Sequence, residues 1–112
     1  MTKFAATFST GQTITRNSDH AYAFAWAVIR TSDGKIEAKG FSSDRANAAK
    51  AAQAKMWSGP SARDRKHPGI RRLWAKMAKE QGFASVDALI AHWEKQNAEH
   101  NAARRIEIVA VA

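Results

Sequence analysis

The stretch that decides the fold is residues 22–56, which read YAFAWAVIRTSDGKIEAKGFSSDRANAAKAAQAKM. Large and small side chains alternate in its first part, with the two-residue period of a β-strand. The large ones are Tyr22, Phe24, Trp26 and Val28. Ser32-Asp33-Gly34-Lys35 follows, and its central Asp-Gly suits the positive φ angles of a two-residue type I′ turn. The stretch therefore predicts a β-hairpin followed by an alanine-rich helix.

The pairing that this turn predicts places Trp26 opposite Phe41 and leaves the other face of the hairpin with small side chains. That face would hold Ala25, Ala27, Ile29, Ile36, Ala38 and Gly40. The helix that follows, capped by Ser42 or Ser43 and ending near Trp57, is rich in alanine as well. Because two surfaces without bulk can approach closely, we expect the helix to dock on the small-sided face. The aromatic face then needs a second cover.

The flanking segments supply further elements. Residues 3–16 predict one strand or a bent pair of short strands, with Gly11 as a bulge or a hairpin turn. Residues 58–69 form a polar, basic connector, and Pro68 suits the start of a second helix. The second helix ends at Gly82, and Ser85 caps a third. Each of these helices carries an apolar stripe, so we expect the pair to cover the aromatic face of the sheet.

The predicted fold class is α+β, in a single domain over residues 1–112. An antiparallel sheet of three to four strands packs with the alanine-rich helix and a C-terminal helical hairpin. Its segments are 1–57 (strands and first helix), 58–69 (basic connector), 70–103 (helical hairpin) and 105–111 (a last strand at a sheet edge).

Composition narrows the classes of function. The 112 residues include no cysteine, so disulfides, a thiolate nucleophile and cysteine-ligated zinc are excluded. No apolar run could span a bilayer, so we expect no membrane partner and a cytoplasmic location, the host's if a phage encodes the chain. His92, Glu99 and His100 are the nearest approach to a metal set, and ordinary surface histidines explain them. With no catalytic constellation, we expect no enzyme activity, no metal and no cofactor.

The net charge of +8 is concentrated in one segment. Residues 63–79 carry seven Lys or Arg residues against Asp64 alone. A basic surface of this kind can contact phosphates or an acidic protein surface. The predicted binding residues are Arg63, Arg65, Lys66, Arg71, Arg72, Lys76 and Lys79.

The aromatic residues of the sheet and the turn at Gly82 suggest two further nucleic-acid interpretations. Aromatic side chains on a sheet face near Arg30 and Lys39 could stack single-stranded bases, although burial as core is the favoured interpretation. Those side chains are Tyr22, Phe24, Trp26 and Phe41. The turn at Gly82 could mark a helix-turn-helix, but the following helix places Asp87 where a phosphate would lie, so that motif is rejected.

Two resemblances bear on function. Gly40, Ser42, Ala46 and Ala49 match the second half of a double-stranded RNA-binding domain, while Asp44 departs from that family's lysines. Over residues 16–55 the chain also resembles small proteins of phages and prophages, including the anti-defence (anti-CRISPR) group. The matching residues are Arg16, Ser18, His20, Ala21, Tyr22, Ala25, Trp26, Gly34, Lys35, Gly40, Phe41 and Ser42.

The phage resemblance implies a stoichiometric inhibitor that docks on a protein or nucleoprotein complex of a bacterial host. The predicted function is accordingly that of a non-catalytic basic binding protein. The alternative is direct binding of DNA or RNA through residues 63–79.

Overall fold

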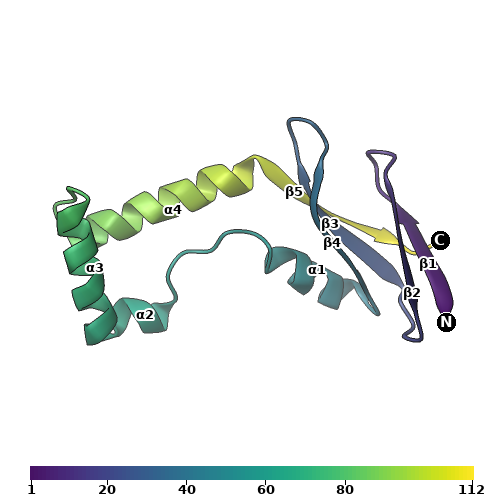
Figure 1. The fold of residues 1–112 in the computed structure, drawn as a ribbon, viewed down its shortest axis with the longest axis horizontal. Coiled ribbons are helices and arrows are strands. Elements are labelled where there is room, and N and C mark those ends of the chain that lie inside the picture. Colours follow the sequence, from purple (N-terminus) through teal and green to yellow (C-terminus); the bar gives the residue numbers. More distant parts are fainter. The chain divides into compact units, whose positions relative to one another are not determined.

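The computed structural model describes residues 1–112 and has five strands and four helices (Figure 1). Their order along the chain is β1 (Thr2–Thr7), β2 (Thr13–Ser18), β3 (Phe24–Arg30), β4 (Ile36–Ser42), α1 (Arg45–Gln53), α2 (Ala62–Lys66), α3 (Pro68–Glu80), α4 (Val86–Ala102) and β5 (Arg104–Ala110). The predicted α+β class is confirmed.

The chain forms two compact units where the sequence predicted one domain. The first unit comprises Met1–Met56 together with Asn101–Ala112, and the second comprises Trp57–His100. The first boundary lies just before Ser58-Gly59-Pro60, a segment that breaks secondary structure. We call them the sheet unit and the helical unit.

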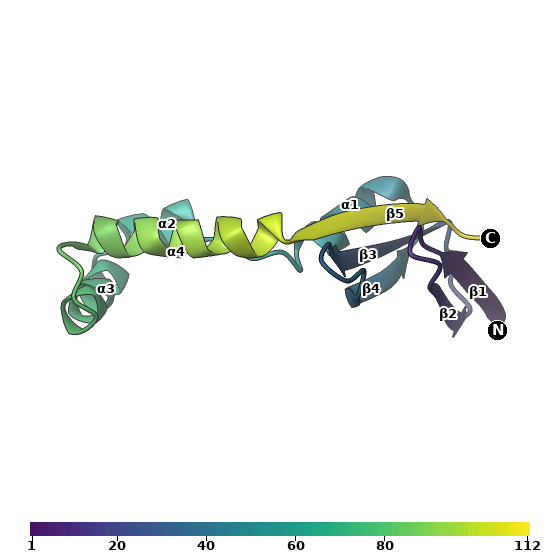
Figure 2. The same cartoon turned by 90° about the horizontal axis from the view of Figure 1, so that it is seen from above.

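The sheet unit contains two antiparallel sheets. The larger has the order β4-β3-β5, and the smaller is the β1–β2 hairpin. Gly11, with a φ of 86°, lies in the turn between β1 and β2, so of the two roles considered for it the hairpin turn is the one observed. β5 lies alongside β3 at the edge of the larger sheet, which confirms the predicted edge strand (Figure 2).

The β3–β4 hairpin has a longer turn than predicted. Arg30 N donates to Lys35 O at 2.9 Å, and Gly34 N donates to Arg30 O at 2.8 Å, so the loop contains four residues rather than two. Asp33 accepts a hydrogen bond from Lys35 N at 3.1 Å, and only Gly34 has a positive φ, 72°. The predicted type I′ turn is wrong, because it requires positive φ at both central residues.

This turn shifts the strand register by one residue at Trp26. Trp26 pairs with Gly40 rather than with Phe41, and the register shifts again between Val28 and Ile29. Because side chains alternate between faces, a slip of one residue exchanges the faces of a strand. Gly40 therefore lies on the same face as Trp26, and Phe41 lies on the opposite face.

Helix α1 covers the face that carries Trp26. Trp26 and Val28 form a buried cluster with Ala48 and Ala52 of α1. The predicted docking of this helix on the small-sided face is therefore wrong, as is the predicted cover of the aromatic face by the helical hairpin. The physical reason is complementarity of size, since the large indole fills the space that Gly40, Ala48 and Ala52 leave open.

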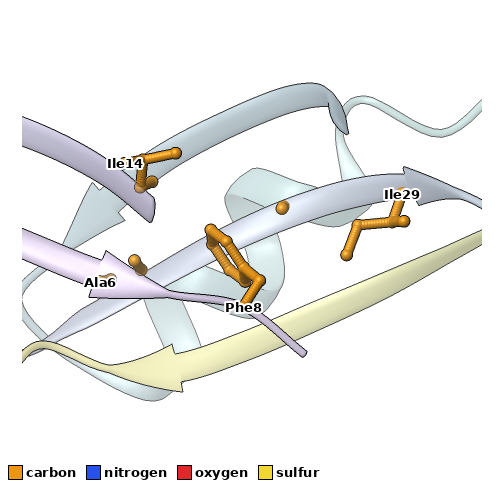
Figure 3. Packing of buried hydrophobic residues seen from close by; sticks show 6 residues of the cluster. Ala6, Phe8, Ile14 and Ile29 are labelled. Carbon is orange, nitrogen blue, oxygen red and sulfur yellow. The ribbon is translucent and has the colours of Figure 1, made fainter. Parts of the chain in front are cut away.

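The small-sided face of the larger sheet is covered by the β1–β2 hairpin. Ala25, Ala27 and Ile29 of β3 are buried against Ala6, Phe8 and Ile14. Figure 3 shows Phe8 lying over the strand that carries Ile29. The core of the sheet unit therefore has two layers, one on each side of β3.

The helix ends agree in part with the prediction. Asp44, rather than Ser42 or Ser43, caps α1 by accepting from Asn47 N at 2.7 Å. The predicted connector contains the short helix α2, capped by Ser61. The remaining caps are confirmed: Ser85 Oγ accepts from Ala88 N at 3.1 Å at the start of α4, and Gly82, with a φ of 82°, follows α3.

A charged hydrogen-bond cluster joins the β1–β2 loop to β5. Ser9 donates to the Glu107 carboxylate through both its N and its Oγ at 2.9 Å, and Arg105 Nη1 donates to Glu107 Oε2 at 3.2 Å. Burial alone would raise the pKa of Glu107, but the hydrogen bonds from Ser9 and Arg105 outweigh it and lower that pKa. The ionised carboxylate therefore helps to hold the two sheets together.

Replacing Glu107 with glutamine is expected to lower the free energy of unfolding at pH 7 by about 1 kcal/mol. Since the folded-state pKa of Glu107 is depressed, its contribution is fully present above the unfolded-state value of 4.5 and is lost as the pH falls through the folded-state pKa. Urea unfolding of both proteins from pH 7 to pH 3 measures this. The difference in the free energy of unfolding between the two proteins should become smaller as the pH falls. The control variant Glu80→Gln, at an exposed side chain, should have the same free energy of unfolding as the parent at every pH. A difference that stays constant would show that the charge of Glu107 contributes nothing.

Candidate functional site

The sequence-predicted binding residues lie on two helices of the helical unit. Arg63, Arg65 and Lys66 are on α2, and Arg71, Arg72, Lys76 and Lys79 are on α3. The structure therefore brings the seven together within one unit. Their surroundings separate them into two groups.

The apolar stripe of α3 explains which way its cations point. Trp74 lies edge-on against Trp93 of α4, with ring centroids 5.5 Å apart, and Ala78 is buried. Leu89 and Ile90 of α4 are buried as well. At 100° per residue, Arg72, Lys76 and Lys79 fall within one narrow arc on the side of α3 away from Trp74 and Ala78.

Two of the seven cations are used inside the helical unit. Arg65 Nε donates to Pro60 O at 3.0 Å, and its guanidinium also pairs with Glu94 of α4. Arg71 Nη1 donates to Arg65 O at 2.9 Å, and its Nη2 lies 3.4 Å from Asp87 Oδ1. Both side chains are half-buried and tie α2 and α3 to α4. These two guanidinium groups are therefore less able to bind an external partner than the other five cations are.

The other five cations are exposed and engaged by no ion pair or hydrogen bond. They are Arg63, Lys66, Arg72, Lys76 and Lys79. Three of them form a row at positions i, i+4 and i+7 along α3, so they are neighbours on the helix surface. We call Arg72, Lys76 and Lys79 the basic face of α3.

An exposed leucine borders this basic face. Leu73 is 57% exposed, although the sequence assigns it to the apolar stripe of α3. It lies one turn before Lys76 and one position after Arg72, at the margin of the stripe. Sequence reasoning missed Leu73 as a surface residue because the spacing of the stripe does not show which of its members lies at the edge.

The aromatic residues that could have formed a stacking platform are divided between the two faces of the larger sheet. Trp26 is 6% exposed and belongs to the core, as the favoured interpretation predicts, but α1 covers it rather than the helical hairpin. Tyr22 instead lies between Phe4 and Phe41, at centroid distances of 5.2 and 5.7 Å. The Arg16 guanidinium lies 5.3 Å from the Tyr22 ring centroid, within the range of a cation–π contact.

The histidines lie apart from one another in local roles. His67 Nδ1 accepts from Ile70 N at 3.3 Å at the start of α3, and His100 stacks on Trp57 with centroids 3.5 Å apart. His92 lies against Phe83, and His20 is exposed near Tyr22. No group of three or more His, Asp or Glu side chains is arranged to hold a metal ion.

Comparisons with protein families, with curated proteins and with solved structures find no match to this chain. None of its helices is long and apolar enough to cross a membrane.

Proposed function

We propose that this protein is a non-catalytic binding protein whose basic face on α3 docks on an acidic protein surface. One observation carries the proposal: Arg72, Lys76 and Lys79 have no acidic partner, and Leu73 is exposed beside them. The phage resemblance suggests the kind of partner, a protein or nucleoprotein complex of a bacterial host. Docking there as a stoichiometric inhibitor would fit the anti-defence group.

The exposed leucine favours a protein partner over bare nucleic acid. Phosphate contacts depend on cations and polar groups, so an isolated leucine adds little to them. On a protein surface the same side chain can be buried, at about 25 cal/mol for each Å² of apolar area removed from water. Flanking cations at the rim then supply steering and orientation toward an acidic patch.

Direct binding of DNA or RNA is the second candidate. The observation in its favour is that Arg63 and Lys66 on α2 are exposed and unpaired, as the three cations of the basic face are. Five such cations could neutralise several phosphates. Affinity for bare nucleic acid would then fall steeply with salt, because each contact releases condensed counterions.

Reversing Arg72 and Lys76 to glutamate should weaken capture of the protein partner at least tenfold, and Leu73→Ser should weaken it as well. The measurement is quantitative pull-down from nuclease-treated bacterial lysate, paired with anisotropy titrations of labelled duplex DNA and duplex RNA at several salt concentrations. Lys95→Glu on α4 is a matched control, because Lys95 is exposed, engaged by no ion pair and outside the basic face. It should leave capture unchanged.

The two candidates differ in their response to Leu73. If the cations contact phosphate, bare duplex should bind tightly at physiological salt, the double reversal should flatten the salt dependence, and Leu73→Ser should have no effect. That combination would refute docking on a protein and establish nucleic-acid binding in its place.

A further inference from the structure

Two strand edges in the sheet unit are free and border a groove. β2 pairs only with β1, and β4 pairs only with β3. Two hollows of about 350 and 160 Å³ lie between these strands, and both are lined by Ile14 and Lys39. Because they share Ile14 and Lys39, the two hollows adjoin, and together we call them the groove between β2 and β4, which runs from Lys35 to Phe41.

The groove offers main-chain hydrogen bonds to an added strand. An edge strand presents a row of unpaired N–H and C=O groups, which is the template that β-strand addition uses. β4 contains no proline, so its outward amide groups remain available. α1 packs on the face of the larger sheet that carries Trp26, while the groove is lined by Ile14 and Phe41, which belong to the layer on the opposite face.

The charge along the groove is positive. Arg16, Lys35 and Lys39 line it, and none of them has an acidic partner. Glu37, the acid among its lining residues, is 2.8 Å from Arg104 Nε and 3.9 Å from Arg30 Nε. The acid is thus compensated by arginines of its own sheet, and the three cations remain available to an occupant.

The same cations select against a second copy of the chain. Lysines on an edge strand hinder pairing with another edge of like charge, and this chain carries a net charge of +8. A strand with acidic side chains would instead be attracted, since its carboxylates would face Arg16, Lys35 and Lys39.

The side chains below the cations set the pattern of the occupant. Ile14 is buried, and Ile36 and Phe41 are half-buried members of the same hydrophobic cluster. In an added strand, alternate residues point to opposite faces. Lys39 and Phe41 lie two residues apart on one face of β4, and Ile14 and Arg16 do so on β2. The set of side chains directed at this layer would therefore meet both the apolar floor and the cations beside it, while the other set would face away from it.

We infer that the groove between β2 and β4 binds an extended acidic peptide segment of a protein partner, added as a strand to the edge of β4. On the face of the peptide that is directed at this layer, acidic side chains pair with Arg16, Lys35 and Lys39, and apolar ones between them contact Ile14, Ile36 and Phe41. This site lies in the sheet unit, so it does not depend on the basic face of α3.

The probe is a fluorescently labelled six-residue peptide with blocked ends and the sequence Glu-Thr-Val-Thr-Glu-Thr, which places glutamate and valine on one face of an extended strand. Its anisotropy should rise on titration with the full chain, and the same peptide with lysine in place of each glutamate should not bind. The double variant Lys35→Glu and Lys39→Glu should weaken binding at least tenfold. The matched double variant Lys50→Glu and Lys55→Glu makes the same charge change in and just after α1, away from the groove lining, and should bind within about twofold of the parent. Far-UV circular dichroism confirms that each variant is folded.

Two further experiments test whether the peptide binds as an added strand and whether the groove prefers a peptide to a nucleic acid. Peptides N-methylated on odd or on even residues lose the amide hydrogens on one side, so at least one of the two should fail to bind. If both bind as well as the parent peptide, no strand is added and the inference is wrong. It is also wrong if the lysine reversals leave the peptide's affinity unchanged, or if six-residue oligothymidylate displaces the peptide and binds more tightly.

Discussion

Replacing Trp26 with alanine is expected to lower the free energy of unfolding of the sheet unit by about 3–5 kcal/mol. Trp26 is 6% exposed and packs with Val28 of its own strand and with Ala48 and Ala52 of α1. Its removal leaves a cavity that these neighbours cannot fill, because alanine side chains have no further atoms to extend into it. The loss should therefore be among the largest for any single substitution in the chain.

Urea unfolding followed by far-UV circular dichroism measures this loss without relying on tryptophan fluorescence, which the substitution itself changes. Leu73→Ala, at a side chain that is 57% exposed, serves as the control and should change stability by no more than about 0.5 kcal/mol. A loss below about 1 kcal/mol for Trp26→Ala would show that the indole is not part of the core. The aromatic platform for single-stranded bases would then become the better interpretation.

The second large effect is expected at Gly40, directly opposite Trp26. A Cβ atom at position 40 would lie 2.7 Å from Cε2, Cζ2 and Nε1 of the indole, closer than van der Waals contact permits. Gly40→Ala should therefore lower the free energy of unfolding by about 1–3 kcal/mol. Gly40 does not have a positive φ, so backbone strain makes no contribution to this loss.

A double-mutant cycle isolates the cause. In the Trp26→Leu background the indole is gone, and Gly40→Ala should then stabilise the strand by about 0.5–1 kcal/mol, because glycine in a strand interior has a greater entropy cost than alanine. Urea unfolding of the four proteins gives the coupling free energy. If Gly40→Ala destabilises both backgrounds equally, its effect does not come from contact with Trp26.

The elements of the fold could be predicted from the sequence because each has a local signal. Alternation identifies β3, and the Ser85 cap identifies the start of α4. The faces of the larger sheet could not be predicted, because they depend on the length of one loop. Asp-Gly is compatible with a two-residue turn, but Asp33 pairs with Arg30 and accepts from Lys35 N, and these contacts stabilise a four-residue loop. Thr31 and Ser32 join the loop, both on the side of β3, and the irregularity between Val28 and Ile29 leaves a net shift of one residue at Trp26. That shift places Gly40 opposite Trp26, on the face that α1 covers.

The candidate site could be predicted in its location but not in its composition. The charge count identifies residues 63–79, and the basic face of α3 lies within them. That Arg65 and Arg71 are used internally depends on Glu94 and Asp87, which are 29 and 16 residues away in the sequence. The groove between β2 and β4 had no sequence signal, because it depends on which strand edges remain without a neighbour.

The position of β5 also determines the order in which the sheet unit can be completed during synthesis. Thr31, just after β3, donates to Ala103, just before β5, across 72 residues of chain. Until the segment beyond His100 has left the ribosome, β3 lacks one of its two neighbours, and its buried side chains remain exposed to other nascent chains. Closing so long a loop makes the final pairing slow relative to formation of the local β1–β2 and β3–β4 hairpins. A nascent chain held just short of β5 should therefore be a preferred substrate for chaperones, and emergence of β5 from the ribosome should end that dependence.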